Sequence, residues 1–568
     1  MVYDGFVSLI GGMDEGLDPS ALQPTNYVRG LNVTNRGGLV KTRPAFKKIC
    51  DLETGDFKGA FSYRLHDAHR IVYGHGAQVS VLRLDTLATA NVGALSAADR
   101  FYFAQPDRYC VVQDDASSPV VIDEDAAYTG TNSIPVGSIM AYGHGRLFVV
   151  PRYAYDSDGN PTALNGRPYF LAGDLIKPYQ PGEVLKFTEA SYLNEGGGFA
   201  LANESGYITG MSFIRNALSA ISQGPLVVFG EYGVSAFGID AERSTWNDID
   251  IAYTLFTDHG GQSDRGVLPV NNDIIFRSDD GIRTITYSSQ KVRSGLANDP
   301  VSDEVREVLA LDDAEDRAAT SMAYADGRAF MLSGGRDSDN CFRAIVSLDF
   351  SIASRLGQSA DPAYDGIWTG LKFQQILSAR YQGERTLLVI AKNGAKNELW
   401  RLSGSQDEYQ DGSASPTRCR LYTRQYNFTL MGQRKRFDHL DVWVKDLRGS
   451  VDLTAYWRPD GYRLWNKCRT VTIASDVSAG GLPQNRYRVR VEPLAEVFDE
   501  ATDHDVQSGD LFQFCIQWTG SCTIEKVRMG AVESPDEPLY YDQETANALA
   551  ESANSVTLDD FAYTIGAS

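Results

Sequence analysis

Three short stretches of the sequence contain the side chains that metal binding or acid–base chemistry requires. Residues 278–281 read Ser-Asp-Asp-Gly, residues 66–75 include three histidines, and residues 156–160 read Asp-Ser-Asp-Gly-Asn. Carboxylates and imidazoles bind metal ions and transfer protons. Each stretch must therefore be weighed as a chemical site against a turn or a surface loop.

The Ser278–Gly281 stretch nearly matches the Asp box of sialidase-type propellers, Ser-x-Asp-x-Gly-x-x-Trp. Ser278 and Asp280 fit, but Gly281 follows Asp280 directly, so the spacing is one residue short. A glycosidase needs paired carboxylates across a cleft, and no spacing in this sequence singles out a pair. Asp280-Gly281 is also one of several such pairs, with Asp326-Gly327, Asp365-Gly366 and Asp460-Gly461. A repeated pair indicates hairpin corners.

The histidines and the second acidic loop also have simple structural interpretations. In a strand His66 and His69 would face opposite sides, and His75 is too distant unless the chain turns, which favours exposed hairpin histidines. Asp156, Asp158 and Asn160 have the opening spacing of a calcium loop, but no acidic residue closes it at the expected distance. We expect a polar surface loop there, with calcium binding as the open alternative.

Other signatures of catalysis are missing from the sequence. It contains no G-x-S-x-G elbow, P-loop or dinucleotide fingerprint. The seven cysteines form no Cys-x-x-Cys pair, which favours buried free thiols. The N-terminus lacks the basic region of a signal peptide, and no apolar run reaches the length of a bilayer span, so no stable membrane insertion is expected. We predict a protein that is not an enzyme, with no catalytic residues, cofactor or metal.

The elements that surround these stretches repeat one pattern. A corner with Gly or Asp leads into a run of β-formers, as at 143–150, 223–230, 279–285, 325–332 and 382–390. The corners recur about every 35–60 residues, with a longer gap at 150–223 that we expect to contain another unit. This predicts an all-β protein with a β-propeller of six or seven blades over residues 41–415. Helices are expected only at 302–311, with Ser302 as N-cap, and at 543–552.

The pattern changes near residue 416. Residues 416–530 carry 17 Lys and Arg against 14 Asp and Glu, and they contain long alternating stretches. This predicts an antiparallel β-sandwich platform domain, which the N-terminal arm, residues 1–40, can join. Residues 531–568 hold eight acidic residues and no Lys or Arg, which predicts an acidic C-terminal arm. The tryptophans lie in apolar strand patterns, so we expect core packing: Trp246, Trp368, Trp400, Trp443, Trp457, Trp465 and Trp518.

Several phrases, taken in order, resemble the tail nozzle (tail tubular) proteins of short-tailed bacteriophages. They are G-G-M-D-E-G-L-D-P-S-A-L at 11–22, R-G-G-L-V-K-T-R-P-A-F at 36–46, Q-G-P-L-V-V-F-G-E-Y-G-V-S-A-F-G at 223–238, N-N-D-I-I-F-R-S-D-D-G-I-R-T-I at 271–285, D-P-V-S-D-E-V at 299–305, Y-D-G-I-W-T-G-L at 364–371 and V-W-V-K-D-L-R-G-S-V-D-L-T-A-Y-W-R-P-D at 442–460. The resemblance covers about residues 10–530, with no counterpart for 531–568.

The resemblance implies a structural virion protein, made in the host bacterial cytoplasm. Such proteins form a hexameric ring below the adaptor of the head-tail connector, with tail fibre, spike or needle proteins as further partners. Genomic DNA passes through the lumen at ejection without specific binding. The formal net charge of −21 agrees with a wall that does not hold DNA tightly. The alternatives are a receptor- or glycan-binding propeller of the tail tip, and a hydrolase that uses Asp280.

Overall fold

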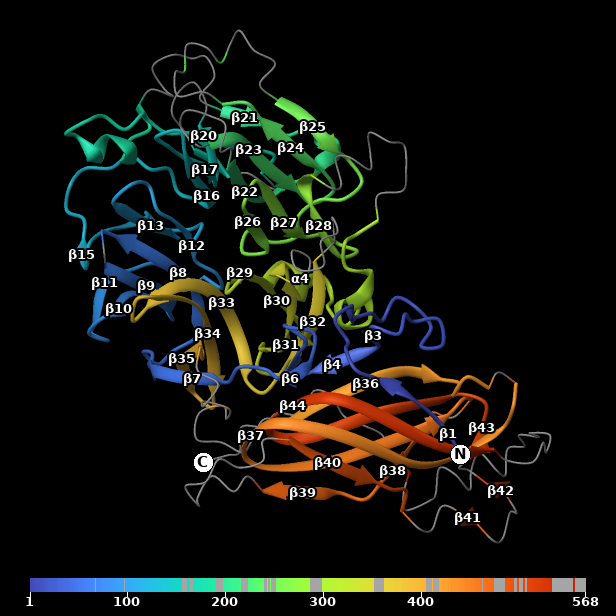
Figure 1. Ribbon diagram of the computed structural model, residues 1–568. Coiled ribbons are helices and arrows are strands. Elements are labelled where there is room, and N and C mark those ends of the chain that lie inside the picture. Colours follow the sequence, from blue (N-terminus) through green and yellow to red (C-terminus); the bar gives the residue numbers. More distant parts are fainter. Residues whose placement is uncertain are drawn as a thin grey trace.

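The computed structural model is built almost entirely of β-strands, as Figure 1 shows. The structure describes residues 1–66, 68–96, 98–155, 161–163, 167–188, 198–215, 223–239, 243, 246, 252–286, 299–351, 362–404, 411, 418–430, 432–461, 463–474, 486–494, 498–499, 504–505, 508–533 and 555–556. Within these ranges no helix is long and apolar enough to cross a membrane.

Seven groups of three or four antiparallel strands in the described residues follow one another around a ring, and the last two groups are also linked to each other and to further strands (Figure 1). The first contains β8 (Phe57–Leu65), β9 (Ala68–His75), β10 (Gln78–Arg83) and β11 (Thr89–Ala94). The second contains β12 (Tyr102–Ala104), β13 (Tyr109–Gln113), β14 (Val120–Asp123) and β15 (Ala126–Ala127). The third contains β16 (Gly137–Gly143), β17 (Arg146–Pro151), β20 (Tyr169–Ala172) and β21 (Gly198–Ala200). The third sheet occupies the long gap between predicted corners.

The remaining sheets complete the ring. The fourth contains β22 (Ile208–Arg215), β23 (Gln223–Gly230), β24 (Val234–Phe237) and β25 (Ala252–Phe256), and the fifth contains β26 (Val267–Val270), β27 (Asp273–Arg277) and β28 (Ile282–Thr284). The sixth contains β29 (Met322–Ala325), β30 (Arg328–Arg336), β31 (Phe342–Asp349) and β32 (Ala363–Trp368). The seventh contains β33 (Lys372–Tyr381), β34 (Glu384–Asn393), β35 (Lys396–Leu402) and β7 (Phe46–Asp51).

The contacts between the first strands of the sheets make this ring a closed propeller. In order, β8, β12, β16, β22, β26, β29 and β33 each contact the next, and β33 contacts β8. The described strands therefore form seven blades. The sequence alone could not choose between six blades and seven. The last blade takes its outer strand from the other end of the chain, because β7 pairs with β35 in the register Phe46↔Leu402. This pairing closes the ring, because one blade combines strands from the two ends of the propeller segment.

A second body, which we call the platform, is built on two long strands. β37 (Lys435–Pro459) pairs with β44 (Phe512–Glu533) along nearly its whole length. One half of β37 also pairs with β40 (Arg486–Val491), and the other half with β39 (Val471–Ala474) and β38 (Trp465–Lys467). β36 (Arg418–Tyr426) pairs with β44. The alternating stretches 439–444 and 450–457 thus lie on one irregular strand.

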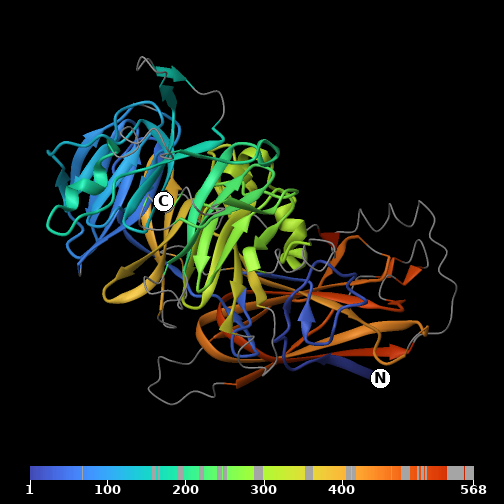
Figure 2. The same cartoon turned by 90° about the horizontal axis from the view of Figure 1, so that it is seen from above.

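The N-terminal residues belong to the platform and connect it to the propeller. β1 (Val2–Phe6) and β6 (Val40–Thr42) pair with β44, while β4 (Arg29–Leu31) pairs with both β32 and β36. Figure 2 shows these dark blue strands among the orange and red strands of the platform. At the other end, β45 (Ser555–Val556) pairs with β38 of the same chain.

The other elements are short. They are β2 (Gly12–Met13), β3 (Asn26–Tyr27), β5 (Val33–Thr34), β18 (Tyr153–Tyr155), β19 (Pro161–Ala163), β41 (Phe498–Asp499), β42 (His504–Asp505), β43 (Ser508–Gly509), η1 (Pro181–Leu185), η2 (Asn203–Ser205), η4 (Asp303–Val305), α3 (Arg306–Leu309) and α4 (Ala314–Ala319).

The helical prediction at 302–311 needs two corrections. The segment is a 3₁₀ turn, η4, followed by the short helix α3, and the Ser302 side chain makes no capping hydrogen bond. Its hydroxyl instead accepts a hydrogen bond from the amide of Ile282 at 2.9 Å. α4, which the sequence analysis missed, begins at a capping box formed by Asp313 and Asp316. The predicted helix at 543–552 lies outside the described residues.

The tryptophans follow the core prediction with one exception. Six are buried: Trp246, Trp368, Trp400, Trp457, Trp465 and Trp518. Trp443 is half-buried on the outer side of the platform, where cationic side chains surround its ring, so the core interpretation is wrong for this residue. All seven cysteines are free, and six of them are buried.

Candidate functional site

The Ser278–Gly281 stretch forms the corner between β27 and β28. The amide of Ser278 donates to the carbonyl of Gly281 at 2.8 Å, and the Ser278 hydroxyl donates to Asp280 Oδ1 at 2.6 Å. Arg283 binds both carboxylate oxygens of Asp280, at 3.1 and 2.6 Å. Burial raises the pKa of Asp280, but these hydrogen bonds outweigh it and the pKa is lowered. Asp280 therefore fixes the turn and holds the buried Arg283.

Glycine has a different role at this corner from the one the sequence suggests. The backbone of Gly281 is not in the left-handed region, but a Cβ there would come within 2.6 Å of Pro300 and Ser302. Asp326-Gly327 does follow the turn interpretation, with φ of 50° and 70° between β29 and β30. Asp365-Gly366 does not, because it lies inside β32, where the Asp365 carboxylate is fully buried. Asp-Gly is thus a turn signal at some of these positions and a close-packing device at others.

One group that the sequence does not reveal lies beside this corner. His259 Nδ1, from the loop before β26, is 3.1 Å from Asp279 Oδ1 and 3.8 Å from Asp280 Oδ2. Among the described residues, these three form the one His, Cys, Asp and Glu group whose ligand atoms lie within 4.8 Å of one another. A cation placed here would share Asp280 with the Arg283 guanidinium that already binds both of its oxygens. The arrangement fits a surface ion pair better than a metal centre.

The histidines of residues 66–75 are separated by their hairpin. His66 lies at the turn between β8 and β9, with φ of 51°, and its side chain is exposed. His69 and His75 are half-buried, and His75 Nε2 contacts Ser80 Oγ at 2.9 Å. Burial, together with nearby Arg64 and Arg380, lowers the pKa of His69. Asp156, Asp158 and Asn160 lie outside the described residues.

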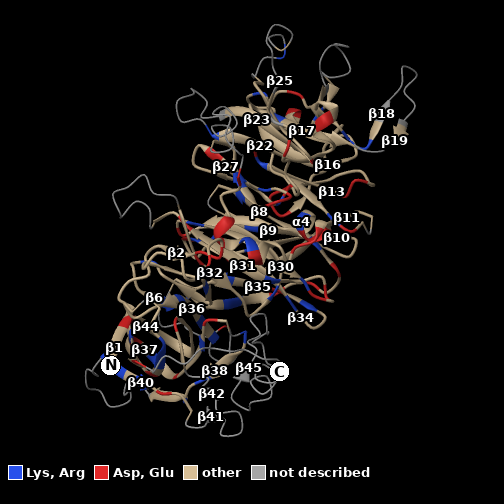
Figure 3. Cartoon of the chain, turned by 90° about the vertical axis from the view of Figure 1, so that its right-hand side faces the viewer, with Lys and Arg blue, Asp and Glu red and all other residues tan. Residues whose placement is uncertain are grey.

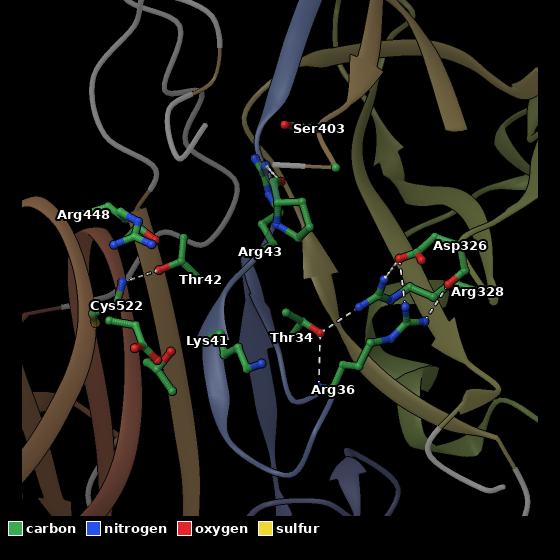
Figure 4. A pocket seen from close by; sticks show the side chains of 15 residues that line it. Thr34, Arg36, Lys41, Thr42, Arg43, Asp326, Arg328, Ser403, Arg448 and Cys522 are labelled. Carbon is green, nitrogen blue, oxygen red and sulfur yellow. Dashed lines mark hydrogen bonds and ion pairs between the residues drawn. The ribbon is translucent and has the colours of Figure 1, made fainter. Parts of the chain in front are cut away.

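A cavity of about 230 Å³ lies where the propeller, the N-terminal segment and the platform meet (Figure 4). Three arginines in its wall are held by ion pairs. Arg36 binds Asp349 at 2.7 Å, Arg328 binds Asp365 at 3.1 Å, and Arg43 binds Asp411 at 2.7 Å. The Arg36 and Arg43 pairs join the N-terminal segment to a propeller blade and to the loop after β35, and the Arg328 pair lies within one blade.

The side chains around this cavity have a structural role, because they hold neighbouring parts of the molecule together. Its wall includes Ser403 and Cys522, but burial raises the pKa of the Cys522 thiol well above its ordinary value, so the reactive thiolate is not favoured. The carboxylates beside the cavity already bind arginines.

Comparisons with known proteins add a fold-level likeness only. No protein family and no curated protein matches the sequence. Among solved structures, the β-propeller domain of Myceliophthora thermophila Cps50 (Swd1) and the mitotic checkpoint complex each match 63% of this chain and 100% and 94% of their own, at 11% identity and a TM-score of 0.36. The WD40 repeats of RRP9 match 64% of this chain and 99% of their own, also at 11% identity and 0.36. These scores are too low to carry an argument, so the propeller assignment rests on the strand pairing.

Proposed function

We propose that this protein is the ring-forming nozzle of a short bacteriophage tail, which extends the DNA channel below the portal and adaptor. The observation that carries the proposal is the union of a closed seven-bladed propeller with a long-stranded platform through β4, which pairs with β32 of the propeller and β36 of the platform. A ring subunit needs such a rigid body, because each half must keep its position against a neighbouring copy. The ordered sequence resemblance over residues 10–530 supports the same function.

In this proposal the platform is a β-sandwich and faces the channel, and the propeller lies outside. Six copies form the ring, which binds the adaptor above and fibre, spike or needle proteins around it. The protein is not an enzyme, and its place is the virion tail. Residues 531–568 form an acidic arm that contacts a neighbouring subunit, although its described part, β45, pairs with the chain's own β38.

Native mass spectrometry and negative-stain imaging of the purified full chain, alone and with the adaptor ring, test the proposal. We expect a six-fold annulus with a central hole wide enough for duplex DNA. A chain that stays monomeric with the adaptor present would contradict the nozzle function. Deleting residues 534–568, which leaves β44 intact, should weaken the ring; rings of unchanged stability would remove the arm from the proposal.

A receptor- or glycan-binding propeller is the second candidate, and one observation favours it. Tyr207 and Tyr232 are 49% and 61% exposed on the blade of β22 to β25, and the amide of Glu231 donates to the carbonyl of Tyr207. Paired exposed aromatic rings suit sugar stacking. Glycan-array binding that is lost in Tyr207→Ala with Tyr232→Ala, but kept in Tyr179→Ala, would favour this function. Tyr179 is a matched control because it is fully exposed on another part of the propeller.

A further inference from the structure

The outer face of the platform sheet formed by β40, β37 and β44 carries an ordered set of cationic side chains. Arg486, Arg488 and Arg490 alternate with Tyr487, Val489 and Val491 along β40; Val489 and Val491 are buried, and the three arginines are exposed. Figure 3 shows Lys and Arg in blue on these strands.

The strand register arranges these side chains in two rows across the sheet. In one row Asp441 of β37 lies between Arg490 and Arg528, and in the next Trp443 lies between Arg488 and Lys526. Side chains two residues apart on one strand share a face. We call these six residues the arginine–tryptophan face.

A single buried carboxylate organises the arginines. Asp441 is fully buried, and it accepts hydrogen bonds from Arg488 at 2.7 Å, Arg490 at 3.1 Å and Arg528 at 2.8 Å. Burial raises the pKa of Asp441, but the three guanidinium groups outweigh this and lower it strongly, so the carboxylate stays charged. Each guanidinium has five N–H donors, and these side chains remain 40–47% exposed. The arginines are fixed in place with donors left for a ligand.

The positive charge on this face exceeds the negative charge. Asp441 balances one of the four cations Arg488, Arg490, Lys526 and Arg528. Of the neighbouring acids, Glu525 pairs with Arg486, Asp438 contacts His439 Nδ1 at 2.6 Å, and Glu492 ends the exposed side of β40. The acids therefore lie at the rim of the face, and the excess of cations lies at its centre.

Flat aromatic surfaces lie among the cations. The Trp443 ring centroid is 4.3 Å from Lys526 Nζ and 5.2 Å from the Arg488 guanidinium carbon. The Arg528 guanidinium lies 4.6 Å from the ring centroid of Tyr3, which is 46% exposed. Cationic side chains beside aromatic rings are the combination by which proteins bind single-stranded nucleic acids, through phosphate contacts and base stacking.

We propose that the arginine–tryptophan face binds the phosphate backbone of a nucleic acid strand, with bases stacking on Trp443. An acidic peptide would use the cations but would leave the half-buried Trp443 ring without a partner of matching shape. The face is an open sheet surface, so binding is independent of sequence and depends steeply on salt. If the protein is a nozzle, passing duplex DNA meets this face through its phosphates alone, because its bases are paired; that step rests on the proposed function, whereas binding of a single strand does not.

Fluorescence anisotropy of a labelled single DNA strand, mixed with the full chain, tests the proposal. The strand has about 20 nucleotides, because such a site covers roughly 4–16 nucleotides. We expect binding that weakens steeply between about 50 and 200 mM salt. Because the chain has a net charge of −21, its bulk charge repels DNA, and binding must come from a local surface. No binding at the lower salt concentration would overturn the inference.

The variants avoid Asp441 and its arginines, since the loss of an arginine could unfold the sheet. Lys526→Glu and Trp443→Ala should each weaken binding about fivefold or more, and Trp443→Phe should keep most of it. Lys396→Glu, on an exposed corner of the propeller, makes the same charge change and should bind like the wild type. An equal loss in Lys396→Glu would mean that net charge alone acts, and would overturn the assignment to this face. Ring formation, observed separately by negative stain, reports on the nozzle proposal alone.

Discussion

At the scale of single residues, substitution of Asp280 distinguishes a role in fixing the turn from a role in catalysis. Asp280→Asn removes the charged partner of Arg283, whose side chain is only 1% exposed. We expect a loss of about 1–3 kcal/mol in the free energy of unfolding, measured by urea denaturation, because a buried donor group loses its acceptor. Asp279→Asn is the matched control, since Asp279 is half exposed and should change stability by less than about 0.5 kcal/mol. A stable Asp280→Asn protein that lost a hydrolase activity would contradict this assignment.

The same carboxylate gives a dependence on pH. The pKa of Asp280 is lower in the folded protein than its ordinary value. A carboxylate of this kind stabilises the fold above its unfolded-state pKa, near 3.9, and the contribution is lost as the pH falls through the folded-state pKa. The stability difference between wild type and Asp280→Asn should therefore be present near neutral pH and shrink below about pH 4. Urea denaturation at each pH measures it, and a difference that grows on acidification would contradict the ion pair.

At the scale of elements, the closure of the ring depends on β7. Phe46 is fully buried and packs against Phe373, with ring centroids 5.8 Å apart. Phe46→Ala should lower the free energy of unfolding by about 3–5 kcal/mol and expose the N-terminal segment to protease. Phe101→Ala, at an equally buried position between β11 and β12, should cost similar stability without that early cleavage. Equal cleavage in both variants would mean that β7 does not close the ring.

The sequence indicates strands well where the pattern is local, as in 486–491, which is β40. It could not choose the blade number, because the seventh blade pairs β35 with β7 from a distant part of the chain, and such a pairing leaves no local spacing. The side chains of the candidate sites show the same limit. His259 and Asp279 are brought together only by the fold. The half-buried Trp443 is different, because the alternation of β37 already places it on the face of Asp441 and Lys445, opposite the buried Val442 and Val444.

At the scale of the whole molecule, Arg43 is the residue that most directly couples the two bodies. It follows β6 of the platform and precedes β7 of the propeller, and its guanidinium binds Asp411, Asn32 and the carbonyl of Thr369. Both members of the Arg43–Asp411 pair are almost fully buried. Arg43→Ala leaves the Asp411 carboxylate buried and unpaired, at a cost of about 3–5 kcal/mol.

Because Arg43 lies where the propeller meets the platform, Arg43→Ala should change the number of unfolding transitions as well as the midpoint temperature. We expect the wild type to show one calorimetric transition, since β4 pairs with strands of both the propeller and the platform, and the variant to show two. Arg385→Ala, an exposed change on a propeller hairpin, should keep the single transition. A variant that unfolds at lower temperature but still in one step would mean that the pairings of β4 suffice to couple the two bodies. If the variant also fails to form rings while each body remains folded, then the rigid union of propeller and platform is what assembly requires.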